Sequence, residues 1–337
     1  MQPDEYKRYI DDYTRRLELI YTGETPQTPF YLNGYTPFSQ EDVKEYSIDI
    51  LRGYTRLQDA NLRSHIKKLE YNGTFRPAVM SNRLYGVHFL DKLFGAEVFF
   101  RDDNWWNKPL EQPVGRLRPF DMGSSETWAM YEQLAKAMVE FSVGDYVIDM
   151  QILSCPVNIA INLMGESFLM ATIIEPKEAR RDIETITASI RQAHSRTRAI
   201  IPERLLRPFA SAYRYTPAGY GEVDGCATQL ISAECYAEFF APHDESILSD
   251  YPNGGIMHLC GASAQHAPTF ARMKSLKAIQ IQNRAMNDFE IYYNTLRADQ
   301  VIYARPNEIY PIERILRVSK GGRRIVICAD NPDEHAC

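Results

Sequence analysis

The chain has 337 residues, a formal net charge of -6 and 45% hydrophobic residues. This composition is ordinary for a folded globular protein and excludes a disordered or collagen-like chain. An acidic chain without a cluster of Lys and Arg is not expected to bind nucleic acid, because neutralising phosphates needs such a cluster. The length suits either one large α/β domain or two smaller ones.

The first twenty residues carry charge throughout, so they lack the apolar core of a secretory signal peptide. No segment approaches the roughly 20 consecutive apolar residues that a membrane-spanning helix requires. Six cysteines in a chain without such a signal are more typical of reduced thiols than of a disulfide framework. We therefore expect a cytoplasmic protein without a membrane partner.

Residues 1–28 are predicted to form a helical cap, and apolar or β-branched runs then alternate with amphipathic stretches. Eight strands are predicted, at residues 29–34, 77–82, 146–151, 222–229, 255–261, 278–282, 300–306 and 323–330. Residues 86–121 are predicted to be an insertion after the second strand, with a helix, a short hairpin and a Pro-rich loop. The alternation favours a (β/α)8 barrel as a single domain over 1–337, with a doubly wound open sheet as the alternative.

The strongest chemical signal is the pair His258 and Cys260. One residue separates them on the fifth predicted strand, so both side chains face the same side. Cys328 lies near the end of the eighth, and the carboxyl ends of barrel strands meet around one mouth. One imidazole and two thiolates suit Zn²⁺ and leave a fourth position open. The alternative is that all three are core residues, since free cysteine is often buried.

Other polar side chains also fall near predicted strand ends. Asp224 is either a buried structural group or an acceptor that faces substrate. Arg305 could hold a substrate carboxylate or phosphate through its guanidinium, or pair with an acid at the rim. The remaining candidates near these ends are Asn33, Asn82, Asp149, Gln151, Cys226, Gln282 and Asp330. Among the other cysteines, Cys226 could lie in the same mouth, whereas the terminal Cys337 is expected to be incidental.

Residues 223–281 resemble the uroporphyrinogen decarboxylase superfamily, in which a strand aspartate precedes a segment like LISAECYAEFFAP and a strand that ends in H-x-C-G. LDKLFGAEVFF at 90–100 and GESFLMATIIEPKEAR at 165–180 are similar to it as well. In this superfamily, H-x-C with a distant cysteine marks the corrinoid-dependent methyltransferases of the methylcobamide:coenzyme M type. The resemblance therefore implies a zinc-dependent methyltransferase in which His258, Cys260 and Cys328 bind Zn²⁺.

In this hypothesis a methyl group passes between a corrinoid, carried by a partner protein, and a small substrate such as a thiol. Asp224, as the catalytic candidate, and Arg305 are expected to orient that substrate. The pocket is expected to be lined by Asn33, Asn82 and Gln282. Relatives of this kind continue through a final helix after the eighth strand, so here the N-terminal helix or a partner subunit is expected to cover that strand.

The decarboxylase branch of the superfamily fits less well. It uses an arginine-rich N-terminal segment and a Gly-His-Gly element in the eighth strand, whereas TPFYLNGYTPF at 28–38 has no arginine and IVICADNP at 325–332 has no histidine. Two other functions remain open. One is a metal-independent lyase that uses Asp224, and the other is a corrinoid- or tetrapyrrole-binding module without catalysis.

Overall fold

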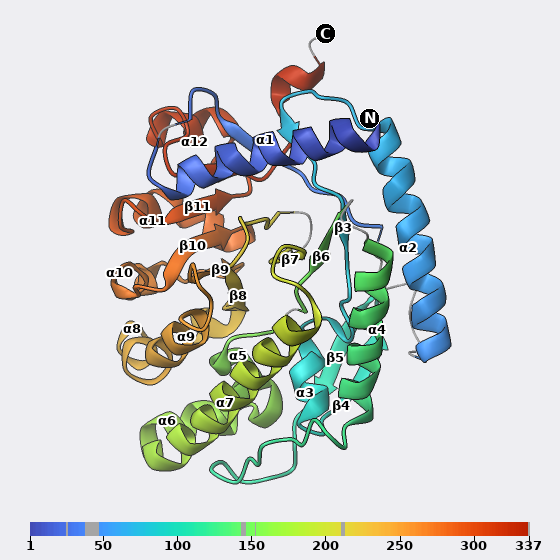
Figure 1. Ribbon diagram of the computed structural model, residues 1–337. Coiled ribbons are helices and arrows are strands. Elements are labelled where there is room, and N and C mark those ends of the chain that lie inside the picture. Colours follow the sequence, from blue (N-terminus) through green and yellow to red (C-terminus); the bar gives the residue numbers. More distant parts are fainter. Residues whose placement is uncertain (25, 38–46, 143–145, 152, 210–212, 336–337) are drawn as a thin grey trace.

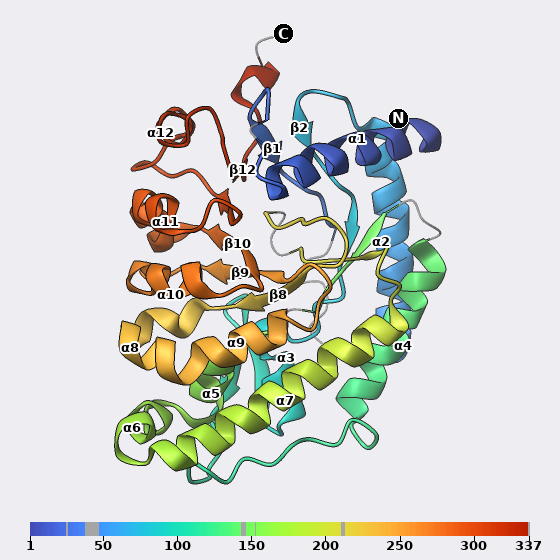
Figure 2. The ribbon, with the colours of Figure 1, turned by 60° about the vertical axis from the view of Figure 1, so that its left-hand side comes forward.

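The structure is a computed structural model that describes residues 1–24, 26–37, 47–142, 146–151, 153–209 and 213–335. Two parallel sheets lie at the centre and helices surround them (Figure 1, Figure 2). The seven-stranded sheet has the order β2-β1-β12-β11-β10-β9-β8, and the three-stranded sheet has the order β3-β6-β7. Two isolated parallel bridges connect the sheets: Tyr35, after β1, pairs with Ala78 before β3, and Ser154, after β6, pairs with Asp224 of β8.

The strands are short, and nearly all of their residues are buried, as expected for parallel strands covered by helices. The larger sheet contains β1 (Phe30–Leu32), β2 (Thr74–Phe75), β8 (Gly221–Asp224), β9 (Gly255–Leu259), β10 (Leu276–Ile281), β11 (Val301–Ala304) and β12 (Ile325–Ile327). The smaller sheet contains β3 (Val79–Met80), β6 (Val147–Asp149) and β7 (Leu206–Arg207).

Each of the eight predicted strands overlaps an observed one, but two short strands, β2 and β7, were not predicted. The prediction for 222–229 is wrong in its second half. After Asp224 the chain leaves the sheet and forms a 3-10 helix, η2 (Cys226–Leu230). Cys226 therefore lies beyond the carboxyl end of β8 and not within the strand.

The predicted N-terminal helix is α1 (Pro3–Tyr21), which begins with Pro3 in its first turn and acidic residues that favour a helix start. Its buried face consists of residues at helical spacing, Tyr6, Tyr9, Tyr13, Leu17 and Ile20. The Tyr13 ring stacks on Phe75 of β2 with 5.0 Å between ring centroids. The hydroxyl of Tyr21 lies 3.2 Å from that of Tyr303 on β11. The helix thus crosses from β2 to β11.

The other long helices lie outside the sheets (Figure 2). They are α2 (Ile48–Lys68), α4 (Glu126–Ser142), α5 (Pro156–Met164), α6 (Glu166–Ile174), α7 (Pro176–Ile200) and α9 (Ala241–Leu248). Shorter ones are α8 (Ala233–Cys235), α10 (Ala267–Arg272), α11 (Phe289–Thr295) and α12 (Ile312–Val318). The predicted insertion contains helix α3 (Phe89–Leu93) and an antiparallel hairpin of β4 (Glu97–Arg101) and β5 (Asn104–Lys108), as expected.

Within the described ranges, no single helix is long and apolar enough to cross a bilayer. The pair α5 and α6 meets the length and composition criteria jointly, with a bend of 112° between the two helices.

Residues 213–217, here called the interior segment, contact strands from several sides of the two sheets. The carbonyl oxygen of Tyr213 accepts from Cys328 after β12 at 3.4 Å, and that of Tyr215 accepts from Tyr303 of β11 at 2.7 Å. The Tyr215 ring also contacts Phe75 of β2, with 5.0 Å between centroids. A chain segment with such partners lies inside the assembly of strands. Sequence periodicity did not predict it, because it has no regular structure.

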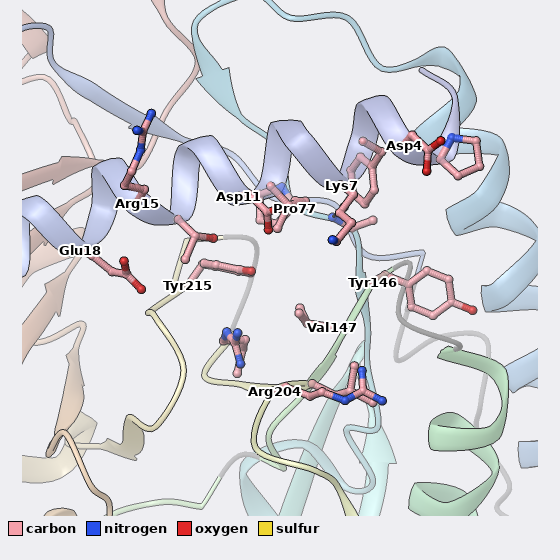
Figure 3. Close-up of a pocket in the computed structure, with 17 residues that line it drawn as sticks. Asp4, Lys7, Asp11, Arg15, Glu18, Pro77, Tyr146, Val147, Arg204 and Tyr215 are labelled. Atoms are coloured by element: carbon pink, nitrogen blue, oxygen red, sulfur yellow. Dashed lines mark hydrogen bonds between the residues drawn. The ribbon is translucent and has the colours of Figure 1, made fainter.

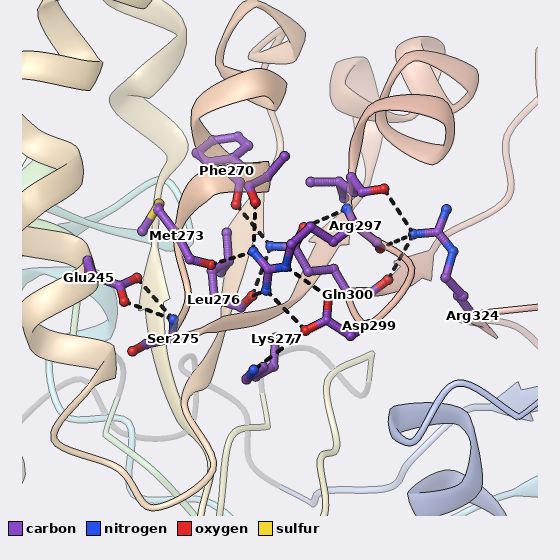
Figure 4. A network of polar contacts seen from close by, with 12 residues as sticks. Glu245, Phe270, Met273, Ser275, Leu276, Lys277, Arg297, Asp299, Gln300 and Arg324 are labelled. Atoms are coloured by element: carbon purple, nitrogen blue, oxygen red, sulfur yellow. Dashed lines mark hydrogen bonds and ion pairs between the residues drawn. The ribbon is translucent and has the colours of Figure 1, made fainter.

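A polar network fixes the amino ends of the last three strands (Figure 4). Arg297 donates from Nη1 to the carbonyl oxygens of Ala271 and Met273, both at 2.7 Å. Gln300 donates to two more carbonyls at 2.9 Å, and Arg324 donates to the carbonyl of Arg297. These side chains satisfy carbonyl oxygens at the end of α10, in the turn after it, at the start of β10 and in the loop before β11, as buried carbonyls require.

We expect Arg297→Met to lower the free energy of unfolding by about 1–3 kcal/mol, since it leaves partly buried carbonyl oxygens without donors. Arg314→Met is a matched control, because Arg314 is also half-exposed and bonds Glu290 at 2.9 Å in an exposed pair. Its loss should be below about 1 kcal/mol. Urea denaturation of both variants measures the difference, and equal losses would show that the network is not a stabilising element.

Candidate metal centre

The pairing register of β8 and β9 brings three potential metal ligands together. Asp224 of β8 lies opposite His258 of β9 in parallel pairing. The residues two positions after each of them therefore lie beyond the same ends of the two strands, close to one another. These residues are Cys226 and Cys260. Their Sγ atoms and a ring nitrogen of His258 all lie within 4.8 Å of one another. The group contains two sulfur donors and one nitrogen donor, which is a donor set that zinc prefers.

The imidazole of His258 is oriented from the neighbouring strand. Gln280 of β10 is the register partner of His258, and its Oε1 is hydrogen-bonded to Nδ1 of the imidazole. An amide oxygen can only accept, so Nδ1 carries the proton and Nε2 is left as the donor atom for a metal. Second partners of this kind fix the ring and the tautomer of metal-binding histidines. His258 is 8% exposed, whereas both cysteines are half-buried.

The two thiols share a hydrogen bond that shifts their acidities in opposite directions. The bond from Cys226 lowers the pKa of Cys260 to about 5, although burial opposes the shift, and His258 adds to it. The same bond, together with burial, raises the pKa of Cys226. Near neutral pH the pair therefore holds one thiolate, on Cys260, which Cys226 and His258 stabilise.

A buried charge cluster lies next to this group. Nη1 of Arg214, in the interior segment, is 2.5 Å from Oδ1 of Asp224 and 3.0 Å from Oε2 of Glu222. Burial alone would raise the pKa of Asp224, but Arg214 and His258 outweigh it and hold that pKa below its usual range. Glu222 is not hydrogen-bonded to the arginine, and burial raises its pKa to about 8. One cation thus stabilises one carboxylate, and Glu222 keeps its proton at neutral pH.

Cys328, the third ligand expected from the sequence, does not belong to the group of three. It is 2% exposed, and its Sγ contacts the carbonyl oxygen of Tyr213 at 3.4 Å. Tyr213 and Arg214 are adjacent, and they contact Cys328 and Asp224 respectively. The interior segment therefore stands between Cys328 and the metal-ligand group. The thiol that lies near His258 and Cys260 is that of Cys226.

The other predicted site residues lie in separate places. Gln282 follows β10 and accepts from Gln280 at 3.4 Å, which puts it beside the group. Arg305 is exposed and stacks over the Tyr213 ring at 4.3 Å, on the side of Cys328.

Two of the predicted pocket residues, Asn33 and Asn82, lie away from the group of Cys226, His258 and Cys260. Asn33 donates to Asp330 at 2.9 Å near the junction of β1 and β12. Asn82 is fully buried after β3, next to Tyr131. The predicted Cys337 is outside the described residues.

Arg214 and Glu222 were not among the site residues expected from the sequence. Glu222 lies two positions before Asp224 on β8, and side chains two positions apart on a strand point to the same face. This alternation would have predicted that both carboxyl groups share one face. Two acidic side chains on the inner face of a buried strand require a cation, and this requirement was the available signal. Nothing in the sequence indicated that the cation would come from an irregular segment.

The arrangement of strands and helices is shared with solved structures. One of these is a methyltransferase from Methanosarcina mazei, with a TM-score of 0.63 and 12% sequence identity over 95% of this chain and 94% of that chain. The likeness extends over nearly the whole of both chains, and at this identity it establishes a common fold. No protein-family model and no curated protein matches the sequence.

The protonation of Glu222 predicts a pH effect on stability. Its pKa is about 8 in the folded protein against an ordinary value of 4.5, so folding favours the protonated form. This contribution is complete below about pH 4.5 and is lost as the pH rises towards 8. Glu222→Gln should therefore reduce the loss of stability between pH 5 and 8, as measured by urea denaturation at each pH. The exposed control Glu203→Gln should keep the wild-type slope, and an identical slope in Glu222→Gln would contradict the assignment.

The hydrogen bond between the thiols of Cys226 and Cys260 predicts that Cys260 is unusually reactive in protein treated with a chelator to remove metal. Iodoacetamide should alkylate Cys260 well below pH 8, because its thiolate is already present. Cys226→Ala removes the donor and should move the pH midpoint of alkylation upwards, whereas Cys235→Ala, at a half-buried cysteine of α8, should not. Peptide mass spectrometry across the pH range would follow each cysteine. An unchanged midpoint in Cys226→Ala would refute the shared hydrogen bond.

Proposed function

We propose that this chain is a zinc-dependent methyltransferase in which Cys226, His258 and Cys260 bind the metal. The observation that carries the proposal is the convergence of two thiols and one imidazole within 4.8 Å beyond the carboxyl ends of β8 and β9. Functional groups of parallel α/β barrels lie at this end of the strands. The fold shared with a solved methyltransferase supports the reaction class.

The donor atoms fit a tetrahedral zinc ion. Zinc–sulfur bonds of about 2.3 Å and zinc–nitrogen bonds of about 2.0 Å place ligand atoms roughly 3.5–3.8 Å from one another, so these side chains need to move only a little. Three protein ligands leave the fourth position open for a substrate. When bound there, the zinc ion would act as a Lewis acid that keeps a substrate thiol deprotonated.

The protein's own residues prepare this site in three ways. Gln280 orients His258, and Cys226 stabilises the Cys260 thiolate before any metal arrives. Arg214 holds Asp224 beside His258, where its negative charge favours a bound cation. In this proposal Asp224 is a positioning residue and does not itself accept a proton.

The substrate proposed here is a small molecule, with the methyl group exchanged with a corrinoid on a partner protein in the cytoplasm. Gln282, beside the metal ligands, is proposed to line the pocket. Arg305, exposed at the rim, is proposed to bind an anionic group of the substrate, as arginine does with carboxylates. Asn33 and Asn82 remain proposed lining residues.

We further propose that the two sheets form one (β/α)8 barrel within a single domain. The bridges Tyr35–Ala78 and Ser154–Asp224 support this, because the first joins the chain after β1 to the start of β3 and the second joins the chain after β6 to β8. Barrel closure removes the open edges that would otherwise attract further strands.

The metal-independent lyase is less well supported by the site. It would use Asp224, whose Oδ1 accepts from Arg214 at 2.5 Å, as the acceptor of a substrate N–H group, and it gives no role to the convergence of Cys226, His258 and Cys260. A corrinoid- or tetrapyrrole-binding module without catalysis would be recognised by visible absorbance of the purified protein.

Metal analysis of protein purified without chelator tests the proposal. We expect stoichiometric zinc in the wild type and its loss in Cys226→Ala and Cys260→Ala, because two remaining ligands bind zinc weakly. Cys328→Ala and the control Cys235→Ala should retain the metal. Methyl transfer from methylcobalamin to a small thiol should follow zinc content across the series.

Two results would count against the ligand set. Absence of zinc from the wild type would overturn the metal site. Loss of zinc in Cys328→Ala with retention in Cys226→Ala would show that the ligands expected from the sequence are the true ones, and that the interior segment moves when metal binds.

A further inference from the structure

A cavity of about 730 Å³ lies at the amino ends of the strands, away from the metal centre (Figure 3). One wall is the face of α1 that includes Asp4, Lys7 and Asp11. The other wall is made by residues at the beginnings of β3 and β6, by Arg204 and Arg207 around β7, and by Tyr215. This volume is in the range of small-molecule sites.

One buried basic side chain of this cavity, Arg207, forms no ion pair with a described residue. Arg207 is 7% exposed and donates from Nη1 to the carbonyl oxygens of Glu203 and Leu206, at 3.0 and 2.7 Å. Its Nε is buried without a hydrogen-bond partner in the described part of the chain. Among the described residues this guanidinium has neither a carboxylate partner nor a full set of acceptors, and burial in that state is costly unless an anion completes it.

Two further cations line the same space. Arg204 and Lys7 are exposed side chains in the lining of the cavity (Figure 3), and neither forms a hydrogen bond or ion pair with any described residue. Arg15 also lines the cavity, but it is paired with Asp12 at 2.8 Å. Asp4, Asp11 and Glu18 of α1 are the acidic groups in the lining.

We propose that this cavity is a binding site for a small molecule that carries a carboxylate or phosphate group, held by Arg204, Arg207 and Lys7. Arginine binds such oxyanions through paired N–H groups, and the guanidinium of Arg207, buried in the wall of the cavity with its Nε unpartnered among the described residues, is placed to contribute its charge. Asp4 and Asp11 lie on α1 on either side of Lys7, facing Arg204 and Arg207 of the other wall, and a positive group on the same molecule would be accommodated beside them. The site is independent of the metal centre, because the interior segment separates the two.

Isothermal titration of the full-length protein with inorganic phosphate, succinate and glycine tests the site. We expect at least one of these probes to bind, with phosphate or succinate preferred if the ligand is a simple anion and glycine preferred if it is zwitterionic. Arg204→Gln combined with Lys7→Gln should weaken binding by roughly tenfold or more. Arg15→Gln, a cavity-lining control whose charge is already paired, should change the affinity less than about twofold.

Arg207→Gln should abolish binding, and its urea denaturation curve reports whether it is folded. If Arg207→Gln is unfolded, the double variant Arg204→Gln and Lys7→Gln, at exposed positions, still tests the site. Absence of binding by all three probes at millimolar concentration would overturn the proposal, as would wild-type affinity in the Arg204 and Lys7 double variant. Loss of zinc in Cys260→Ala should leave this binding unchanged, so failure here and failure of the proposed function are distinguishable.

Discussion

The guanidinium of Arg214 lies in the interior beside Glu222 and Asp224, and much of the candidate site depends on this contact. The carboxylate of Asp224 could not be buried without a cation, because the cost of desolvating an unpaired charge is several kcal/mol, whereas Glu222 beside it is protonated. The cation is carried by a segment without regular structure, so the ion pair also fixes the path of that segment. The backbone of Tyr213 then contacts Cys328, and Asp224 is held beside His258.

This arrangement explains why one thiol and not another joins His258 and Cys260. Cys226 and Cys260 follow neighbouring strands that are in register, so their approach needs no further support. Cys328 follows a strand on the other side of the interior segment, and reaching the imidazole would require the segment to withdraw. The choice of ligand is therefore a question about the position of residues 213–217.

The positions of most strands along the chain were predictable from the sequence, because buried parallel strands appear as short apolar runs between amphipathic helices. The pair His258 and Cys260 was predictable from the period of a strand. Cys226 was placed on a longer strand than the one observed, since the run EVDGCATQ does not show where the sheet ends and the 3-10 helix begins. β7 and the interior segment were missed, because two residues of strand and an irregular stretch have no periodicity.

The spacing of residues along a sequence identifies the end of the sheets at which a side chain lies. It does not identify the side chain's neighbours around that end, which are set by strand order and by whatever fills the interior. Arg305 and Asn33 illustrate the point, since both follow their strands as expected and both have partners away from the metal ligands.

The pairing of β1 with β12 has a consequence for how the protein is made. Phe30 pairs with Val326, so one edge of β1 has no strand partner until nearly the whole chain has left the ribosome. Unpaired edges of apolar strands are sites of aggregation, and contacts between distant residues form slowly. The nascent chain therefore exposes the unpaired, aggregation-prone edge of β1 for most of its synthesis. During that period α1, which packs on β1 through Tyr13 and Phe30, is the element available to shield it.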